Sequence, residues 1–179
     1  MVCQSGVRAW YDELMSELDA RLLNLARQYS QSAKAVLGDG LVSIVLFGSV
    51  ARQQCKPTSD IDLVVVLREA PMSARARRAI LEPVRASAQP SLDRLWREGC
   101  FTDFTEIIFT ASEAETTHRL FLEIIEDGVI LYDAGGFFAG VLARLRETLR
   151  RLGAQRKTLG NLRYWDLKPN FKPGDVVEL

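Results

Sequence analysis

Residues 41–67 read LVSIVLFGSVARQQCKPTSDIDLVVVL, and this stretch decides the fold that we expect. It opens with an apolar, β-branched run, residues 41–47, which stops at Gly48-Ser49. After a predicted helical turn at residues 50–54 and a Lys-Pro-Thr-Ser segment typical of loops, a second apolar run extends from Asp60 to Leu67. Short apolar runs bounded by turn residues predict buried strands, so we expect two strands joined by a turn and a loop.

Helical periodicity lies on both sides of these strands. Upstream, apolar residues at steps of three or four predict a long amphipathic helix that ends near Gly38-Asp39-Gly40. Its apolar face comprises Val7, Trp10, Leu14, Leu18, Leu22, Leu25 and Tyr29. Downstream, residues 73–99 are mostly helical in pattern. Pro83 and Pro90 are expected to kink or divide this helix, because proline lacks a backbone donor and clashes with the preceding turn.

The C-terminal half continues the alternation of strands and helices. Residues 101–110 have the aromatic and β-branched bias of a third strand. Ser112-x-x-Glu115 has the pattern of a capping box and predicts a helix through Ile125, which Gly128 ends. A short fourth strand at 129–132 and a final amphipathic helix after Gly135-Gly136 follow. The predicted apolar side of that helix is Phe138, Val141, Leu142, Leu145, Leu149 and Leu152.

This order of elements predicts an α+β (mixed α/β) fold, in which a small mixed sheet is flanked by helices. We expect residues 1–179 to form a single domain, with an N-terminal helix (1–38), a core (41–133) and a C-terminal helix and tail (134–179). The tail from Arg163 onward is expected to be irregular but apolar enough to dock on the body.

Composition excludes several classes of protein. Lys plus Arg and Asp plus Glu balance at 23 each, so bulk charge predicts neither a nucleic-acid nor a membrane partner. The sequence has neither a signal-peptide pattern nor an apolar run long enough to span a membrane. Cys3, Cys55 and Cys100 lie far apart without CxxC spacing, which argues against a disulfide framework or a zinc site and favours the cytoplasm.

Two carboxylates and a Gly-Ser turn carry the predicted chemistry. Alternation along a strand puts Asp60 and Asp62 on one face, where they repel each other unless a cation lies between them. A hard divalent ion such as Mg²⁺ takes such oxygen ligands and bridges them to phosphates. Gly48 allows close backbone approach, and the Ser49 hydroxyl with the following amides can hold a phosphate. The pattern therefore predicts a site for a metal-bound nucleoside triphosphate.

The segments FGSVAR (47–52) and SDIDL (59–63) resemble the signature of the DNA polymerase β-type nucleotidyltransferase superfamily. The resemblance is greatest to the minimal nucleotidyltransferases and the kanamycin nucleotidyltransferase-like members, and it covers residues 41–133. It implies that Asp60 and Asp62 hold Mg²⁺ or Mn²⁺. It also implies that Gly48, Ser49 and Arg52 bind the triphosphate, with ATP as the expected nucleotide.

The resemblance further implies a third carboxylate from a later strand, which completes the metal site and helps to deprotonate the acceptor. Glu106 fits this position best, as a metal ligand and catalytic residue, and Asp103 is the alternative. The family usually has Asp here, so Glu106 departs from its pattern.

The implied activity is transfer of a nucleoside monophosphate from the metal-bound triphosphate to a hydroxyl acceptor, a small molecule or a protein, with release of pyrophosphate. One alternative is an antitoxin-like module that adenylylates a helical toxin. Another is an inactive nucleotide-binding domain. The long first helix leaves a homodimer or a helical partner protein open, and no nucleic acid is expected. Tyr164-Trp165 offers rings on which a base can stack, although nothing in the sequence requires this role.

Overall fold

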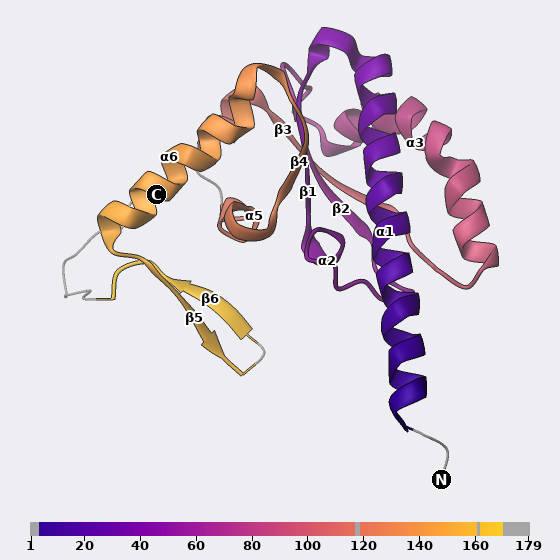
Figure 1. Cartoon of the computed structure of the whole chain (residues 1–179). Coiled ribbons are helices and arrows are strands. Elements are labelled where there is room, and N and C mark those ends of the chain that lie inside the picture. The colour runs from indigo at the N-terminus through magenta and orange to yellow at the C-terminus, as the bar shows by residue number, and fades with distance from the viewer. Residues whose placement is uncertain (1–3, 117–118, 161, 170–179) are drawn as a thin grey trace.

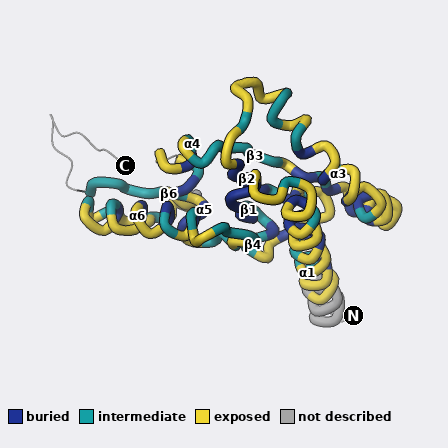
Figure 2. The backbone as a smooth tube through the Cα atoms, turned by 90° about the horizontal axis from the view of Figure 1, so that it is seen from above, coloured by how far each residue is buried: buried dark blue, intermediate teal, exposed yellow. Residues whose placement is uncertain are grey.

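The computed structural model describes residues 4–116, 119–160 and 162–169, with side chains described for all of these except 4–12 and 162. A four-stranded sheet lies between two layers of helices (Figures 1 and 2). In chain order the elements are α1 (Gln4–Leu37), η1 (Gly38–Gly40), β1 (Leu41–Phe47), α2 (Gly48–Ala51), β2 (Ile61–Leu67), α3 (Ala74–Arg97), β3 (Phe104–Thr110), α4 (Ala111–Glu115), α5 (Phe121–Asp127), β4 (Val129–Asp133), η2 (Ala134–Gly136), α6 (Phe137–Leu152), β5 (Gln155–Leu159) and β6 (Leu162–Asp166).

The sheet has the order β3-β2-β1-β4 and is mixed, which confirms the predicted fold class. β1 pairs antiparallel with β2 and with β4, whereas β2 and β3 pair in parallel. The parallel pair needs a long crossover, which α3 supplies. Every residue of β1 is buried, because helices cover both faces of the sheet.

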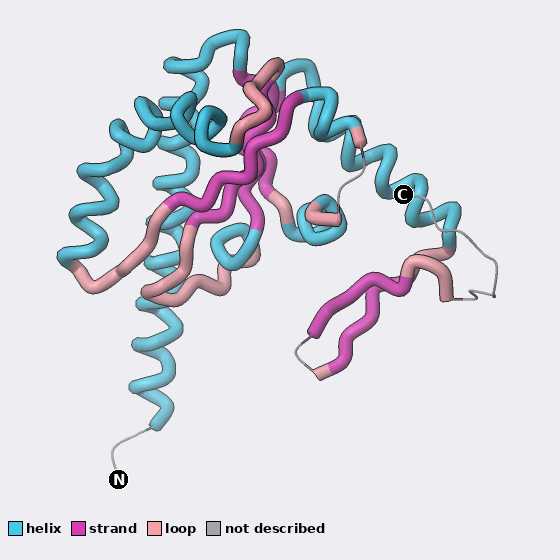
Figure 3. The backbone as a smooth tube through the Cα atoms, turned by 180° about the vertical axis from the view of Figure 1, so that it is seen from behind, coloured by secondary structure: helices cyan, strands magenta, loops and turns pink. Residues whose placement is uncertain are grey.

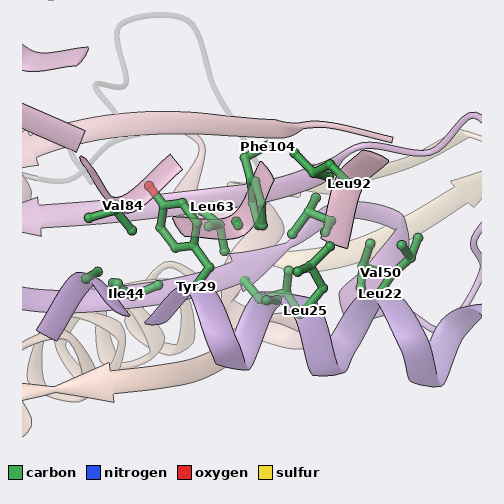
Figure 4. Packing of buried hydrophobic residues seen from close by; sticks show 14 of the residues in the cluster. Leu22, Leu25, Tyr29, Ile44, Val50, Leu63, Val84, Leu92 and Phe104 are labelled. Atoms are coloured by element: carbon green, nitrogen blue, oxygen red, sulfur yellow. The ribbon is translucent and has the colours of Figure 1, made fainter. Parts of the chain in front are cut away.

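Alternation along the strands divides the interior into two cores. One face of the sheet packs on α1 and α3, and we call it the α1–α3 face; Figure 4 shows Tyr29 and Leu25 of α1 packed toward Leu63 and Phe104. The other, the α5–α6 face, packs on α4, α5 and α6. In β2 the first core receives Ile61, Leu63, Val65 and Leu67, and the second receives Val64 and Val66.

Helix α1 ends at Leu37, directly before Gly38-Asp39-Gly40, as predicted. Its buried residues follow the expected stripe: Leu18, Leu22, Leu25, Ala26, Tyr29 and Ala33. Leu14, however, is 42% exposed, since the N-terminal part of α1 projects beyond the sheet (Figure 1). The side chains of Val7 and Trp10 lie outside the described residues.

Helix α3 runs through Pro83 and Pro90 as one helix, so neither proline divides it. Both prolines lie on the exposed side of the helix. The buried side, which includes Leu81, Val84 and Leu92, holds the helix on the sheet and compensates for the lost backbone hydrogen bonds.

The predicted capping box at Ser112 and Glu115 is wrong by two residues. The Thr110 hydroxyl accepts from the Glu113 amide at 3.1 Å, and the Glu113 carboxylate accepts from the Thr110 amide at 2.8 Å. Arg77 of α3 donates two hydrogen bonds of 2.7 Å to the same carboxylate. This tertiary contact favours the capping box at Thr110 and Glu113. The helix stops at Glu115, and a separate α5 ends at Gly128 as expected.

The fourth strand and the final helix are confirmed as β4 and α6. The tail prediction is partly wrong, because β5 and β6 pair as an antiparallel hairpin instead of remaining irregular. The hairpin does dock on the body: the Trp165 indole donates to the Leu122 carbonyl at 3.0 Å. Residues 170–179 lie outside the described part of the chain. Among the described helices, none is long and apolar enough to cross a membrane.

Candidate functional site

Asp60 and Asp62 lie at the start of β2, where β1 ends. Asp62 pairs with Phe47, the last residue of β1, and neighbours Thr105 on β3. Because Ile61 and Leu63 enter the α1–α3 core, alternation turns Asp62 to the α5–α6 face. Asp60 is exposed just before the strand, and its Oδ1 accepts the backbone N–H of Asp103 at 3.2 Å.

The charge of Asp60 reaches the carboxylate of Asp62. Burial raises the pKa of Asp62 above its ordinary value of 3.8, and the negative charge of Asp60 raises it further. Arg52 opposes this shift of the Asp62 pKa, whereas the carboxylate of Glu123 on α5 adds to it. Arg52 therefore offsets the repulsion only in part, and a divalent cation would relieve the rest. Clustered, incompletely neutralised carboxylate oxygens fit an ion such as Mg²⁺.

Gly48, the first residue of α2 directly after β1, lies against Asp62. Its φ of +74° is in the left-handed region, which non-glycine residues rarely adopt. A Cβ atom at Gly48 would also overlap Oδ2 of Asp62 and lie 3.0 Å from its Cγ. The carboxylate therefore rests directly against the Gly48 backbone, and this position needs glycine for two independent reasons.

The residues after Gly48 form the short helix α2. Ser49 is half-buried in the short helix α2, and Arg52 follows at the end of that helix. The Nε atom of Arg52 is buried and has no hydrogen-bond partner among the described residues. Gly48, Ser49 and Arg52 thus lie close to Asp62 in the chain or in space. Within the described residues, the Arg52 guanidinium keeps a free N–H donor, which can bind an anionic ligand.

Glu106, the favoured third carboxylate, is not in this group. It aligns with Leu63 in β3, one residue out of phase with Asp62, so its side chain enters the α1–α3 face. There it is 5% exposed, accepts from the Tyr29 hydroxyl at 2.9 Å and pairs with Arg85 at 2.6 Å. The prediction that Glu106 completes the metal site is therefore corrected: the sheet separates it from Asp60 and Asp62.

Asp103, the alternative, lies closer to Asp60, but its carboxylate is bound by Arg85. Its amide contacts Asp60, while its carboxylate accepts two bonds from Arg85 at 2.9 and 3.0 Å. The same guanidinium also binds Glu106 and the Phe104 carbonyl, so one arginine holds both candidates. Within the described residues, no three His, Cys, Asp or Glu side chains are grouped to hold a metal ion.

Sequence reasoning missed one acidic neighbour of the site. Glu123 is exposed on α5, and its charge reaches Asp62 across the α5–α6 face. No motif spacing marks it, because its proximity arises only from the way α5 packs on the sheet.

Comparison with known proteins finds similarity to nucleotidyltransferases. The family model for a nucleotidyltransferase domain matches residues 28–110. A protein of Methanocaldococcus jannaschii, provisionally named as a protein adenylyltransferase, is 27% identical over 138 residues, which are 75% of this chain and 88% of that protein.

Solved structures show partial resemblance. A toxin–antitoxin complex with AMP-PNP has a chain with a TM-score of 0.41 and 16% identity, covering 69% of this chain and 91% of that one. A chain of the MntA–HepT toxin–antitoxin complex has a TM-score of 0.41 and 14% identity, with coverage of 73% and 92%. A chain of the complex of a tri-AMPylated Shewanella oneidensis HEPN toxin with MNT antitoxin has a TM-score of 0.40 and 13% identity, covering 74% of this chain and 92% of that one.

Gly48→Ala is expected to destabilise the protein more than Gly153→Ala does. Both glycines have positive φ, +74° and +67°, but a Cβ at Gly153 meets nothing within 4 Å. Backbone strain alone costs about 1–2 kcal/mol, and Gly48→Ala adds the overlap with Asp62. Urea unfolding of both variants measures the difference, and equal losses would contradict a tight contact between Gly48 and Asp62.

Asp62→Asn is expected to raise the free energy of unfolding of the metal-free protein at neutral pH. Between the ordinary pKa of 3.8 and the raised folded-state value, the folded chain binds more protons than the unfolded chain. Stability therefore falls as the pH rises through this window, and the full cost of the charged carboxylate is present above it. The free energy of unfolding of both proteins, measured from acid to neutral pH, should show that the advantage of Asp62→Asn disappears at low pH. An Asp62→Asn variant less stable than the wild type at neutral pH would refute the prediction.

Proposed function

We propose that this chain, whose residues 28–110 match the family model for a nucleotidyltransferase domain, transfers a nucleoside monophosphate from a metal-bound triphosphate, with ATP as the expected donor, to a hydroxyl group. The observation that carries this proposal is the pair Asp60 and Asp62, held together beside the Gly48-Ser49 turn with a partly uncompensated charge. The free, buried Cys55 and Cys100 fit a reducing cytoplasmic compartment, and residues 1–179 are proposed to work as one unit.

Each residue of the site has a role in the proposed reaction. Asp60 and Asp62 would hold a divalent cation, Mg²⁺ or Mn²⁺, which neutralises phosphate charge and polarises the reacting phosphoryl group. Ser49 and the α2 backbone would position the outer phosphates, and Arg52 would donate to them as a charged partner. The acceptor oxygen forms a bond to the α-phosphorus as the bond from that phosphorus to the pyrophosphate oxygen breaks.

The acceptor hydroxyl must also lose its proton. With Glu106 on the other face of the sheet, Asp103 is the remaining carboxylate of the two that we considered, and its backbone already contacts Asp60. We propose that Asp103 accepts the proton after its carboxylate leaves Arg85. The side chains of Asp103 and Arg85 are 50% and 30% exposed, so the pair can separate without opening the core.

The acceptor is proposed to be a protein hydroxyl. The relative from Methanocaldococcus jannaschii, which this chain matches over 88% of its length, is named for adenylylating protein. An antitoxin-like role acting on a helical toxin is one form of this proposal, and a small-molecule acceptor is the alternative.

Asp60→Asn and Asp62→Asn are each expected to reduce pyrophosphate release from Mg²⁺ and ATP by about 1,000-fold, because each removes charge from the cation site. Glu106→Gln is the matched carboxylate control, expected to stay within about tenfold of the wild type, since it faces the other core. Circular dichroism would verify folding of all three variants. A Glu106→Gln loss as large as that of Asp62→Asn would restore Glu106 to the site. If the wild type releases no pyrophosphate from any of the four nucleoside triphosphates, the proposed enzymatic activity is refuted.

ATP labelled at the α-phosphate is expected to transfer its label to a protein in a cell extract, and Asp62→Asn should abolish this labelling. Gel electrophoresis followed by mass spectrometry identifies the modified protein and its Ser, Thr or Tyr residue. Label recovered only in small molecules would refute a protein acceptor while leaving nucleotidyl transfer intact.

A further inference from the structure

The β5–β6 hairpin forms one wall of a cavity beside the carboxylates. The hairpin lies on the same side of the sheet as α5 and α6 (Figures 1 and 3). Between the hairpin, α5 and the end of α2 is a cavity of about 180 Å³. Arg52 and Glu123 form the part of its wall that adjoins Asp62, and Tyr164 forms part of the wall contributed by the hairpin.

The hairpin wall is held in place by contacts with α5. Besides the indole bond of Trp165 to Leu122, Arg163 pairs with Asp127 at 3.7 Å. Arg156 pairs with the same Asp127 at 3.4 Å, so both hairpin arginines face a carboxylate. Arg156 also lies 3.8 Å from Glu126, so two carboxylates face the two hairpin arginines, whereas the Nε of Arg52 has no hydrogen-bond partner among the described residues.

The distribution of groups selects the kind of ligand. Glu123 and Asp127 repel phosphates but accept hydrogen bonds from hydroxyl and amino groups. Tyr164 is 42% exposed, which leaves an aromatic ring available for stacking. The volume of about 180 Å³ is below the roughly 300–1,000 Å³ of pockets that enclose a whole ligand, so this cavity suits part of one. A nucleoside has this combination of a flat base and hydroxyl donors.

We propose that the hairpin cavity binds the nucleoside part of the triphosphate, with the base on Tyr164 and sugar or base donors on Glu123 and Asp127. The phosphates then extend past Arg52 to Asp60 and Asp62. The inference rests on the proposed nucleotidyl transfer, and it gives the C-terminal hairpin a direct part in nucleotide binding.

Binding of two probes separates the cavity from the phosphate site. The affinities of ATP and of inorganic tripolyphosphate, each with Mg²⁺, are measured by calorimetry for the wild type and for Tyr164→Ala, Tyr164→Phe and Leu159→Ala. Tyr164→Ala should weaken ATP binding about tenfold and leave tripolyphosphate binding unchanged, because only ATP has a base to stack. Tyr164→Phe keeps the ring and should bind both probes as the wild type does. Leu159→Ala, 72% exposed on the same hairpin and outside the cavity lining, is the matched control.

The remaining outcomes overturn the inference in distinguishable ways. If the wild type binds both probes and Tyr164→Ala leaves ATP affinity unchanged, the cavity does not hold the nucleoside, while the proposed function stands. If that variant instead transfers less label at unchanged ATP affinity, the cavity belongs to the acceptor. If Tyr164→Ala loses affinity for both probes equally, while thermal unfolding shows that it is folded, the hairpin acts on the phosphate site. A wild type that binds neither probe overturns the inference and the proposed function together.

Discussion

The close contact between the Asp62 carboxylate and the Gly48 backbone is the constraint on which the site depends. It brings the end of β1 against the start of β2 and holds a charged group where burial and Asp60 oppose its ionisation. Two buried strands stabilise this arrangement, because their side chains fill cores on both sides of the sheet. The fold thus holds an electrostatically unfavourable group in place.

The face of the sheet decides what each acidic residue does. Asp62 and Glu106 lie on neighbouring strands, yet Glu106 is enclosed with Tyr29 and Arg85 while Asp62 faces α5. A buried carboxylate paired with arginine and tyrosine is satisfied and contributes to packing between α1, α3 and the sheet. Asp62 has no such enclosure, so the same residue chemistry serves structure on one face and the candidate site on the other.

Arg85 connects the two faces. It holds Glu106 in the α1–α3 core and Asp103 at the rim, and the Asp103 amide in turn reaches Asp60. The position of the candidate base therefore depends on a residue of α3 that belongs to the opposite core. On the other side, the hairpin and α5 bring Tyr164 and Glu123 toward Arg52, so elements distant in sequence surround the carboxylates.

Local sequence was enough for the features that depend on neighbours along the chain. Apolar runs, turn residues and the spacing of Asp60 and Asp62 predicted the strands, the end of α1 and two neighbouring carboxylates, since alternation and turn chemistry act within a few residues. Register and long-range partners decided the rest. A one-residue phase difference between β2 and β3 moved Glu106 to the other core, and Arg77 selected the capping box at Thr110. Such choices depend on contacts between distant segments, which only the packed tertiary structure brings together.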